Sequence, residues 1–79
     1  MRTIEKLSVN DSDYSLVVQF DDSSIKKYDC KPLLALSTFR PLHDKNSLSS
    51  VQNKGYYIEW PFYELDISAD TLWHDGEPQ

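Results

Sequence analysis

Apolar side chains recur at every second position from Tyr14 to Phe20, the pattern of a β-strand with one face on a core. Short polar links flank this stretch at residues 10–13 and 21–24, and apolar segments lie beyond them at 4–9 and 25–29. Links this short join antiparallel neighbours, because a parallel crossover needs about a dozen residues or more. The sequence therefore predicts a three-stranded antiparallel meander in the first third of the chain.

Short helical signals follow the meander. Pro32 suits the first position of a helix, since its φ is already set and its missing amide costs nothing there. That helix cannot run past Arg40, because Pro41 disfavours the helical conformation at the preceding residue. Asp44 is placed to cap a single turn that ends near Leu48, and Ser68 is placed to cap a last turn near the C-terminus.

Strand signals return in the second half. The turn residues 53–55 predict a hairpin that joins 49–52 to 56–60, and Pro61 ends its ladder. We therefore expect one α+β domain over residues 1–79, with about five strands in a small antiparallel sheet, one short helix and helical turns. Residues after about 74 are expected to be frayed.

The charge balance restricts the class of partner. With 39% apolar and 27% charged residues the composition is that of a folded globular domain, and the net charge is −5. This field repels nucleic acid and anionic membranes, so we expect a neutral or basic protein partner and direct binding to neither nucleic acid nor membrane. Because no apolar segment follows residues 1–6 and no run of about 18 apolar residues occurs, we also expect a cytoplasmic location. Lys26, Lys27, Lys31 and Arg40 form the candidate basic patch, and a solvated face is the simpler interpretation.

Five of the ten aromatic residues fall between Tyr56 and Tyr63, which is too many rings for one face of one strand. Some of these rings are therefore expected at the surface, where exposed aromatic side chains indicate a partner. The predicted partner-binding residues are Tyr57, Trp60, Phe62 and Tyr63. For Trp60 the competing interpretation is a core position, together with Tyr56 on the same strand face.

The residue types that carry chemistry form no recognisable constellation. Cys30 at a strand end of an acidic protein is expected to be a buried, inert thiol. Two histidines and one cysteine at distant positions do not make a zinc site, so we predict no metal, no cofactor and no catalytic residue. The alternative is a small enzyme or ligand-binding domain that uses Glu64, Asp66 or His74 near the C-terminal turn.

The order of segments resembles a known family. These segments are Asp13 to Phe20, then Tyr28-Asp29-Cys30-Lys31-Pro32-Leu33-Leu34, Phe39-Arg40-Pro41-Leu42, Ile58-Glu59-Trp60-Pro61, Leu65-Asp66 and Asp70-Thr71-Leu72-Trp73. Together they are similar to the small bacterial family labelled domain of unknown function 2442, over nearly the whole chain. The resemblance implies a compact α+β fold and a pairing with another small protein in toxin-antitoxin-like gene pairs, and it supplies no catalytic residues. A homo-oligomer is the other partner that we consider.

Three positions depart from the family pattern. The turn at Asp22-Ser23 lacks the usual glycine, Leu48 stands where relatives tend to have phenylalanine, and Phe62-Tyr63-Glu64 replaces a glycine-containing turn. The last departure puts a rigid aromatic tip where the family has a small one. On these grounds we expect a non-catalytic protein-interaction module, for which the resemblance implies the role of the acidic, antitoxin-like member of a gene pair.

Overall fold

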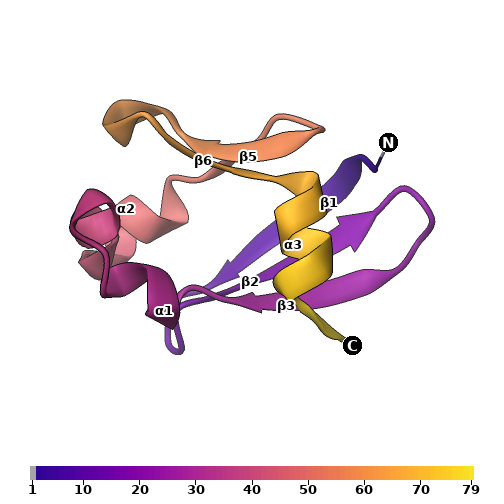
Figure 1. Cartoon of the computed structure of the whole chain (residues 1–79), viewed down its shortest axis with the longest axis horizontal. Coiled ribbons are helices and arrows are strands. Elements are labelled where there is room, and N and C mark those ends of the chain that lie inside the picture. Colours follow the sequence, from indigo (N-terminus) through magenta and orange to yellow (C-terminus); the bar gives the residue numbers. More distant parts are fainter. Residues whose placement is uncertain (1) are drawn as a thin grey trace.

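The computed structural model describes residues 2–79 and arranges them in two antiparallel sheets with helices at their ends. Figure 1 shows a meander along the bottom, a smaller sheet above it, helical segments at the left and one helix at the right. The α+β class predicted from the sequence is confirmed. The strands, however, divide between two sheets, whereas a single small sheet of about five strands was expected.

The first sheet contains the predicted meander. Its strands are β1 (Ile4–Asn10), β2 (Ser15–Phe20) and β3 (Ile25–Asp29), and they pair in that order. Paired residues of an antiparallel sheet point to the same side, so the register Leu7↔Val18 and Val9↔Leu16 puts these four side chains on the core face. The opposite face carries mostly polar residues together with Val17 and Ile25.

The C-terminal segment adds a fourth strand to this sheet. Residues Glu77–Pro78 form β7, which pairs with β3 in the register Lys26↔Pro78 and Lys27↔Glu77. The expected frayed end after about residue 74 is therefore wrong for this segment. A strand of two residues is too short to show an apolar alternation in the sequence. It forms here because β3, some fifty residues earlier in the chain, supplies its hydrogen-bond partners.

The second sheet consists of β4 (Gln52–Asn53), β5 (Tyr57–Trp60) and β6 (Leu65–Ser68). It meets the meander at one corner, where the Ile4 amide donates to the Gly55 carbonyl at 2.7 Å. The Asn53 side-chain amide also donates to the Ile4 carbonyl, at 2.9 Å. These two bonds tie the sheets together without making them continuous.

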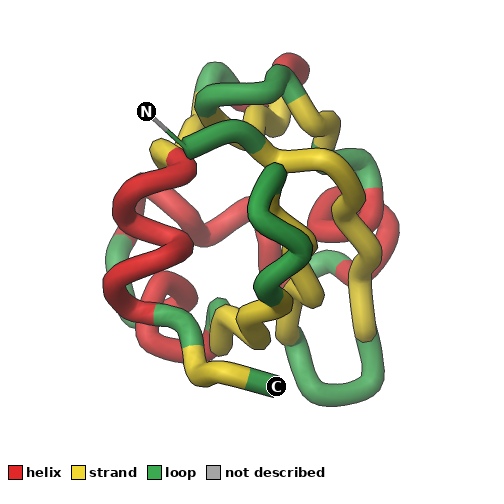
Figure 2. Tube along the Cα trace, turned by 90° about the vertical axis from the view of Figure 1, so that its right-hand side faces the viewer, coloured by secondary structure: helices red, strands yellow, loops and turns green. Residues whose placement is uncertain are grey.

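Helical segments close the space between the sheets (Figures 1 and 2). They are α1 (Lys31–Leu34), the 3₁₀ helix η1 (Ser37–His43), α2 (Lys45–Ser49), the 3₁₀ turn η2 (Pro61–Tyr63) and α3 (Ala69–Asp75). Two predicted caps are present, since Asp44 accepts from the Asn46 amide at 3.3 Å and Ser68 accepts from the Thr71 amide at 3.1 Å.

The core lies between the two sheets and beneath the helices. The alternating residues Leu16, Val18 and Phe20 of β2 are fully enclosed, as the pattern predicted, and so are Ile58 and Leu72. Trp60, Leu42, Leu48 and Cys30 are enclosed with them. Helix α3 seals one end, where the Trp73 ring packs edge-on against Phe20 with centroids 5.3 Å apart.

Candidate functional site

The most exposed large apolar side chain of residues 2–79 is Phe62, which is 86% accessible to solvent. It lies in η2, the turn between β5 and β6 that stands above α2 at the upper left of Figure 1. Pro61 starts this turn and ends the strand, because proline has no amide for the ladder and its φ already suits a 3₁₀ turn. The Phe62 ring therefore projects from the end of the small sheet.

Tyr63 fixes the base of this projection. Its ring contacts the Phe62 ring edge to face, with centroids 5.0 Å apart. Its hydroxyl is 2.6 Å from the Ser47 hydroxyl, which donates in turn to the Asp44 carboxylate at 3.1 Å. Because Asp44 also caps α2, the turn is anchored to a helix through three side chains.

The tip and α2 enclose a shallow groove of about 410 Å³. Its lining combines the two aromatic rings with short polar side chains, namely Asp44, Asn46, Ser47, Ser50, Phe62 and Tyr63. Asp44 is the one charged residue in this lining. We call Phe62, Tyr63 and this groove the aromatic tip.

Two of the four predicted partner-binding residues lie outside the aromatic tip. Trp60 is fully buried and its indole N–H donates to the Leu48 carbonyl at 3.0 Å, so its assignment to a partner surface is wrong. Tyr57 is 39% exposed but begins β5, at the opposite end of the strand from Pro61. Tyr56 was expected in the core and is instead 54% exposed, because it precedes the first residue of the strand.

The three residues of the alternative interpretation, an enzyme or ligand-binding domain, lie on three different elements. Glu64 ends η2, Asp66 is exposed on β6, and His74 lies on α3 beside Asp75, with Nδ1 and Oδ1 3.2 Å apart. Among residues 2–79, no three His, Cys, Asp or Glu side chains gather into a potential metal site. The structure does not assemble these residues into one cleft.

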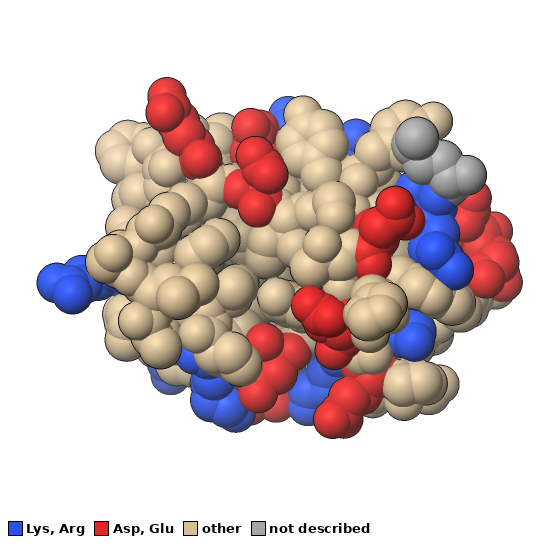
Figure 3. Space-filling view, in the orientation of Figure 1, with Lys and Arg blue, Asp and Glu red and all other residues tan. Residues whose placement is uncertain are grey.

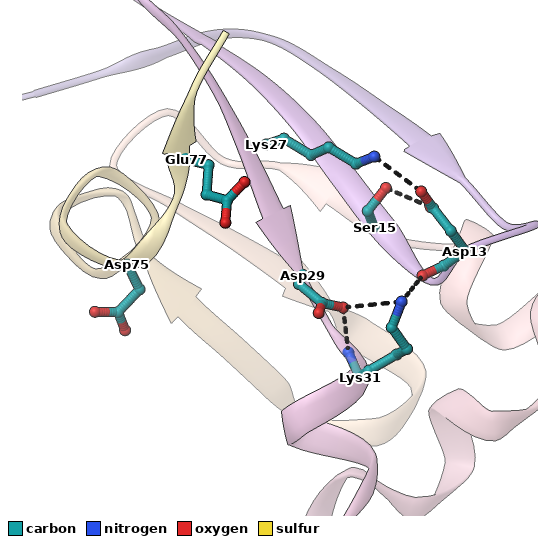
Figure 4. Close-up of a pocket in the computed structure, with 7 residues that line it drawn as sticks. All are labelled: Asp13, Ser15, Lys27, Asp29, Lys31, Asp75 and Glu77. Carbon is teal, nitrogen blue, oxygen red and sulfur yellow. Dashed lines mark hydrogen bonds and ion pairs between the residues drawn. The ribbon is translucent and has the colours of Figure 1, made fainter.

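A second, polar groove of about 230 Å³ lies at the end of the meander (Figure 4). In it the Lys27 ammonium binds the Asp13 carboxylate at 2.9 Å, and Lys31 lies 3.8 Å from Asp29. Ser15 also donates to Asp13, and this bond, followed by the bond from Lys27, lowers the pKa of Asp13 from its usual 3.8. The lysines of this groove are thus neutralised by carboxylates.

The other two cations of the candidate basic patch lie apart from these lysines. The Lys26 ammonium is 4.5 Å from the centre of the Trp73 ring, and Arg40 is exposed on η1. Figure 3 shows acidic and basic side chains interspersed on the face it presents. The four cations do not form a continuous basic surface, which leaves the negative net charge as the dominant long-range field.

Cys30 is fully enclosed at the end of β3. Burial, with a smaller contribution from the neighbouring Asp29, raises the pKa of this thiol to about 12. A thiol with such a pKa carries almost no thiolate at neutral pH, as expected for an inert core residue.

The fold defines a small α+β domain whose two antiparallel sheets are held together by a mixed aliphatic and aromatic core. The family model described as "Protein of unknown function (DUF2442)" matches residues 9–78, and the chain belongs to this family. Comparison with curated proteins and with solved structures gave no match. None of the helices in residues 2–79 is long and apolar enough to cross a bilayer.

Proposed function

We propose that this protein is a non-catalytic protein-interaction module that inserts Phe62 into a pocket of a neutral or basic protein partner. The observation that carries the proposal is the 86% exposure of a phenylalanine ring on an anchored turn. Large exposed rings lower solubility, and aromatic side chains are enriched where interfaces bind tightly.

The anchoring of the turn supports a binding role. The Tyr63, Ser47 and Asp44 side chains hold the turn against α2, so the Phe62 ring is presented in a fixed place before any partner arrives. Preorganisation of this kind reduces the entropy lost on binding. The polar side chains around the rings supply hydrogen-bonding groups for the rim of an interface.

The net charge of −5 favours a neutral or basic partner and its rapid association. In the cell, this chain would act in the cytoplasm as the acidic, antitoxin-like member of a gene pair, the role that the family resemblance implies. Co-expression with the protein encoded beside it tests this role, since an antitoxin relieves the growth defect caused by its partner.

The binding test compares Phe62→Ala with wild type against a partner captured from the source cell. We expect Phe62→Ala to weaken binding by about 30-fold, corresponding to about 2 kcal/mol, as for an interface hot spot. Its stability should change by less than about 1 kcal/mol, because the ring is hardly buried.

Leu36→Ala is the matched control, because Leu36 is also a large exposed apolar residue, at 53%, on another part of the surface. It should bind like wild type in the same calorimetric titration. Normal binding by Phe62→Ala would show that the partner surface lies elsewhere.

A further inference from the structure

Strand β1 is an open edge of the meander sheet, whose order is β1-β2-β3-β7. The two sheets have three other edge strands, β7, β4 and β6, and all three are shorter than β1. Strands β4 and β7 have two residues each, with Pro78 in β7, and β6 has four. β1 has seven residues, and a long edge strand offers a row of unpaired backbone groups to another strand.

The direction of the backbone groups on β1 follows from the hydrogen bonds of β2. The Cys30 amide donates to the Tyr14 carbonyl, and the Phe20 amide donates to the Ser24 carbonyl. The backbone groups of the even-numbered residues of β2 therefore face β3. The odd-numbered residues of β2 therefore bond β1, where their partners are Lys6, Ser8 and Asn10. The N–H and C=O groups of Leu7 and Val9 consequently point out from the open edge.

The ends of this open edge are defined. Toward the N-terminus, a register shift at Glu5 interrupts the ladder, and the Ile4 backbone is already bonded to Gly55 and Asn53. Toward the C-terminus, the strand ends at Asn10. The regular open edge therefore spans residues 6–10, with Ser8 at its centre.

We propose that a second copy of this chain pairs antiparallel with this edge about a two-fold axis at Ser8. In that register Leu7 bonds Val9 of the second copy and Val9 bonds Leu7, so both outward-facing residues of the open edge are satisfied. A register centred on Leu7 would require bonds from the irregular Glu5, and one centred on Val9 would require bonds from the turn beyond Asn10.

Side chains and charge are compatible with this pairing. Leu7 and Val9 are half-buried on the core side, and the two copies bring these apolar side chains together across the axis. On the other side, the small Ser8 faces its copy and Lys6 faces Asn10, so no like charges are opposed within residues 6–10. The carboxylates of Glu5 and Asp11 come opposite each other just beyond the two ends of this regular edge. One glutamate and one lysine make β1 neutral, whereas the whole protein carries −5.

The pairing surface is separate from the aromatic tip, and its test is independent of the proposed function. Sedimentation analysis should show a concentration-dependent shift from 9.2 kDa to about twice that mass. Ser8→Cys should give a covalent dimer with oxidised glutathione, because directly opposed residues have Cα atoms about 4.5 Å apart, within disulfide range. The buried Cys30 does not compete for the oxidant.

Lys6→Cys is the matched control, since Lys6 and Ser8 are both exposed on the same face of β1. Copies of residue 6 would lie about 13 Å apart in this register, too far for a disulfide. Val9→Pro removes an outward N–H without touching the ladder to β2, and it should abolish the mass shift while leaving cooperative melting.

A species of 9.2 kDa at all concentrations up to about 1 mM would overturn the proposal. Equal cross-linking of Lys6→Cys and Ser8→Cys would do the same. A third result would also overturn it: a dimer that is lost in the Phe62→Ala variant and is not cross-linked in the Ser8→Cys variant. The two copies would then meet at the aromatic tip.

Discussion

Replacing Glu64 by glycine is expected to stabilise the protein. Glu64 has φ 54° and ψ 39°, in the left-handed region, and it follows the tip residues Phe62 and Tyr63. This conformation costs a residue with a Cβ about 1 to 2 kcal/mol, whereas glycine adopts it freely.

The expected magnitude is a difference of two terms. Removing the left-handed penalty gains about 1 to 2 kcal/mol, and the greater freedom of glycine in the unfolded chain costs about 0.4 to 1 kcal/mol. The net gain therefore lies between about 0 and 1.6 kcal/mol, and its midpoint of about 0.8 kcal/mol raises the Tm of a domain of this size by about 3 to 6 °C. Glu64 is exposed, so loss of its side chain contributes little.

Thermal melting followed by circular dichroism measures this effect. Glu64→Ala is the control, because it removes the same carboxylate and keeps the Cβ, and it should melt close to wild type. Ser23→Gly, at φ 71°, tests the same reasoning at the β2–β3 turn. A Tm for Glu64→Gly at or below that of Glu64→Ala would refute the assignment of strain to this residue.

Three further predictions concern the core and the polar groove. Val18→Ala should cost about 1 to 3 kcal/mol in denaturant melts through lost burial and a cavity, whereas Val17→Ala on the opposite face should cost less. Ser15→Ala should raise the Asp13 pKa toward 3.8 in an NMR titration. A carboxyl group with a lowered pKa stabilises the fold at pH values above its unfolded-state pKa, and this stabilisation is lost as the pH falls through its folded-state pKa. The Ser15→Ala variant should therefore lose less stability than wild type on acidification below about pH 4. Cys30 should resist iodoacetamide at pH 8 until denaturant unfolds the protein, because its pKa is about 12, and rapid alkylation of the native state would contradict its burial.

Local patterns predicted those parts of the fold that depend on nearby residues. The period-two alternation identified the buried face of β2, and the helix caps at Asp44 and Ser68 follow from side chains that bond amides two or three residues ahead. Pro61 marked the end of β5 because it lacks an amide.

Features that depend on distant partners were harder to predict. The pairing of β7 with β3 depends on residues some fifty positions apart, and the bond from Tyr63 to Ser47 joins residues 16 apart. The aromatic run indicated that some rings are exposed, but alternation alone could not show that the strand starts at Tyr57 and leaves Tyr56 outside. For Trp60 the core position was the competing interpretation, and the acceptor of its indole N–H, the Leu48 carbonyl in α2, lies twelve residues earlier in the chain.

The position of α3 against the meander has a consequence for the order in which the chain folds. Phe20 packs against Trp73, and β2 shares its core with Leu72, so the earliest strands meet their covering residues only near the end of the sequence. A ribosome adding about 5 to 20 residues per second exposes the apolar face of the meander for several seconds before that cover exists. Native packing of the first sheet therefore waits until residue 73 has left the exit tunnel, and a chain stalled earlier presents the apolar face of its strands to chaperones and proteases.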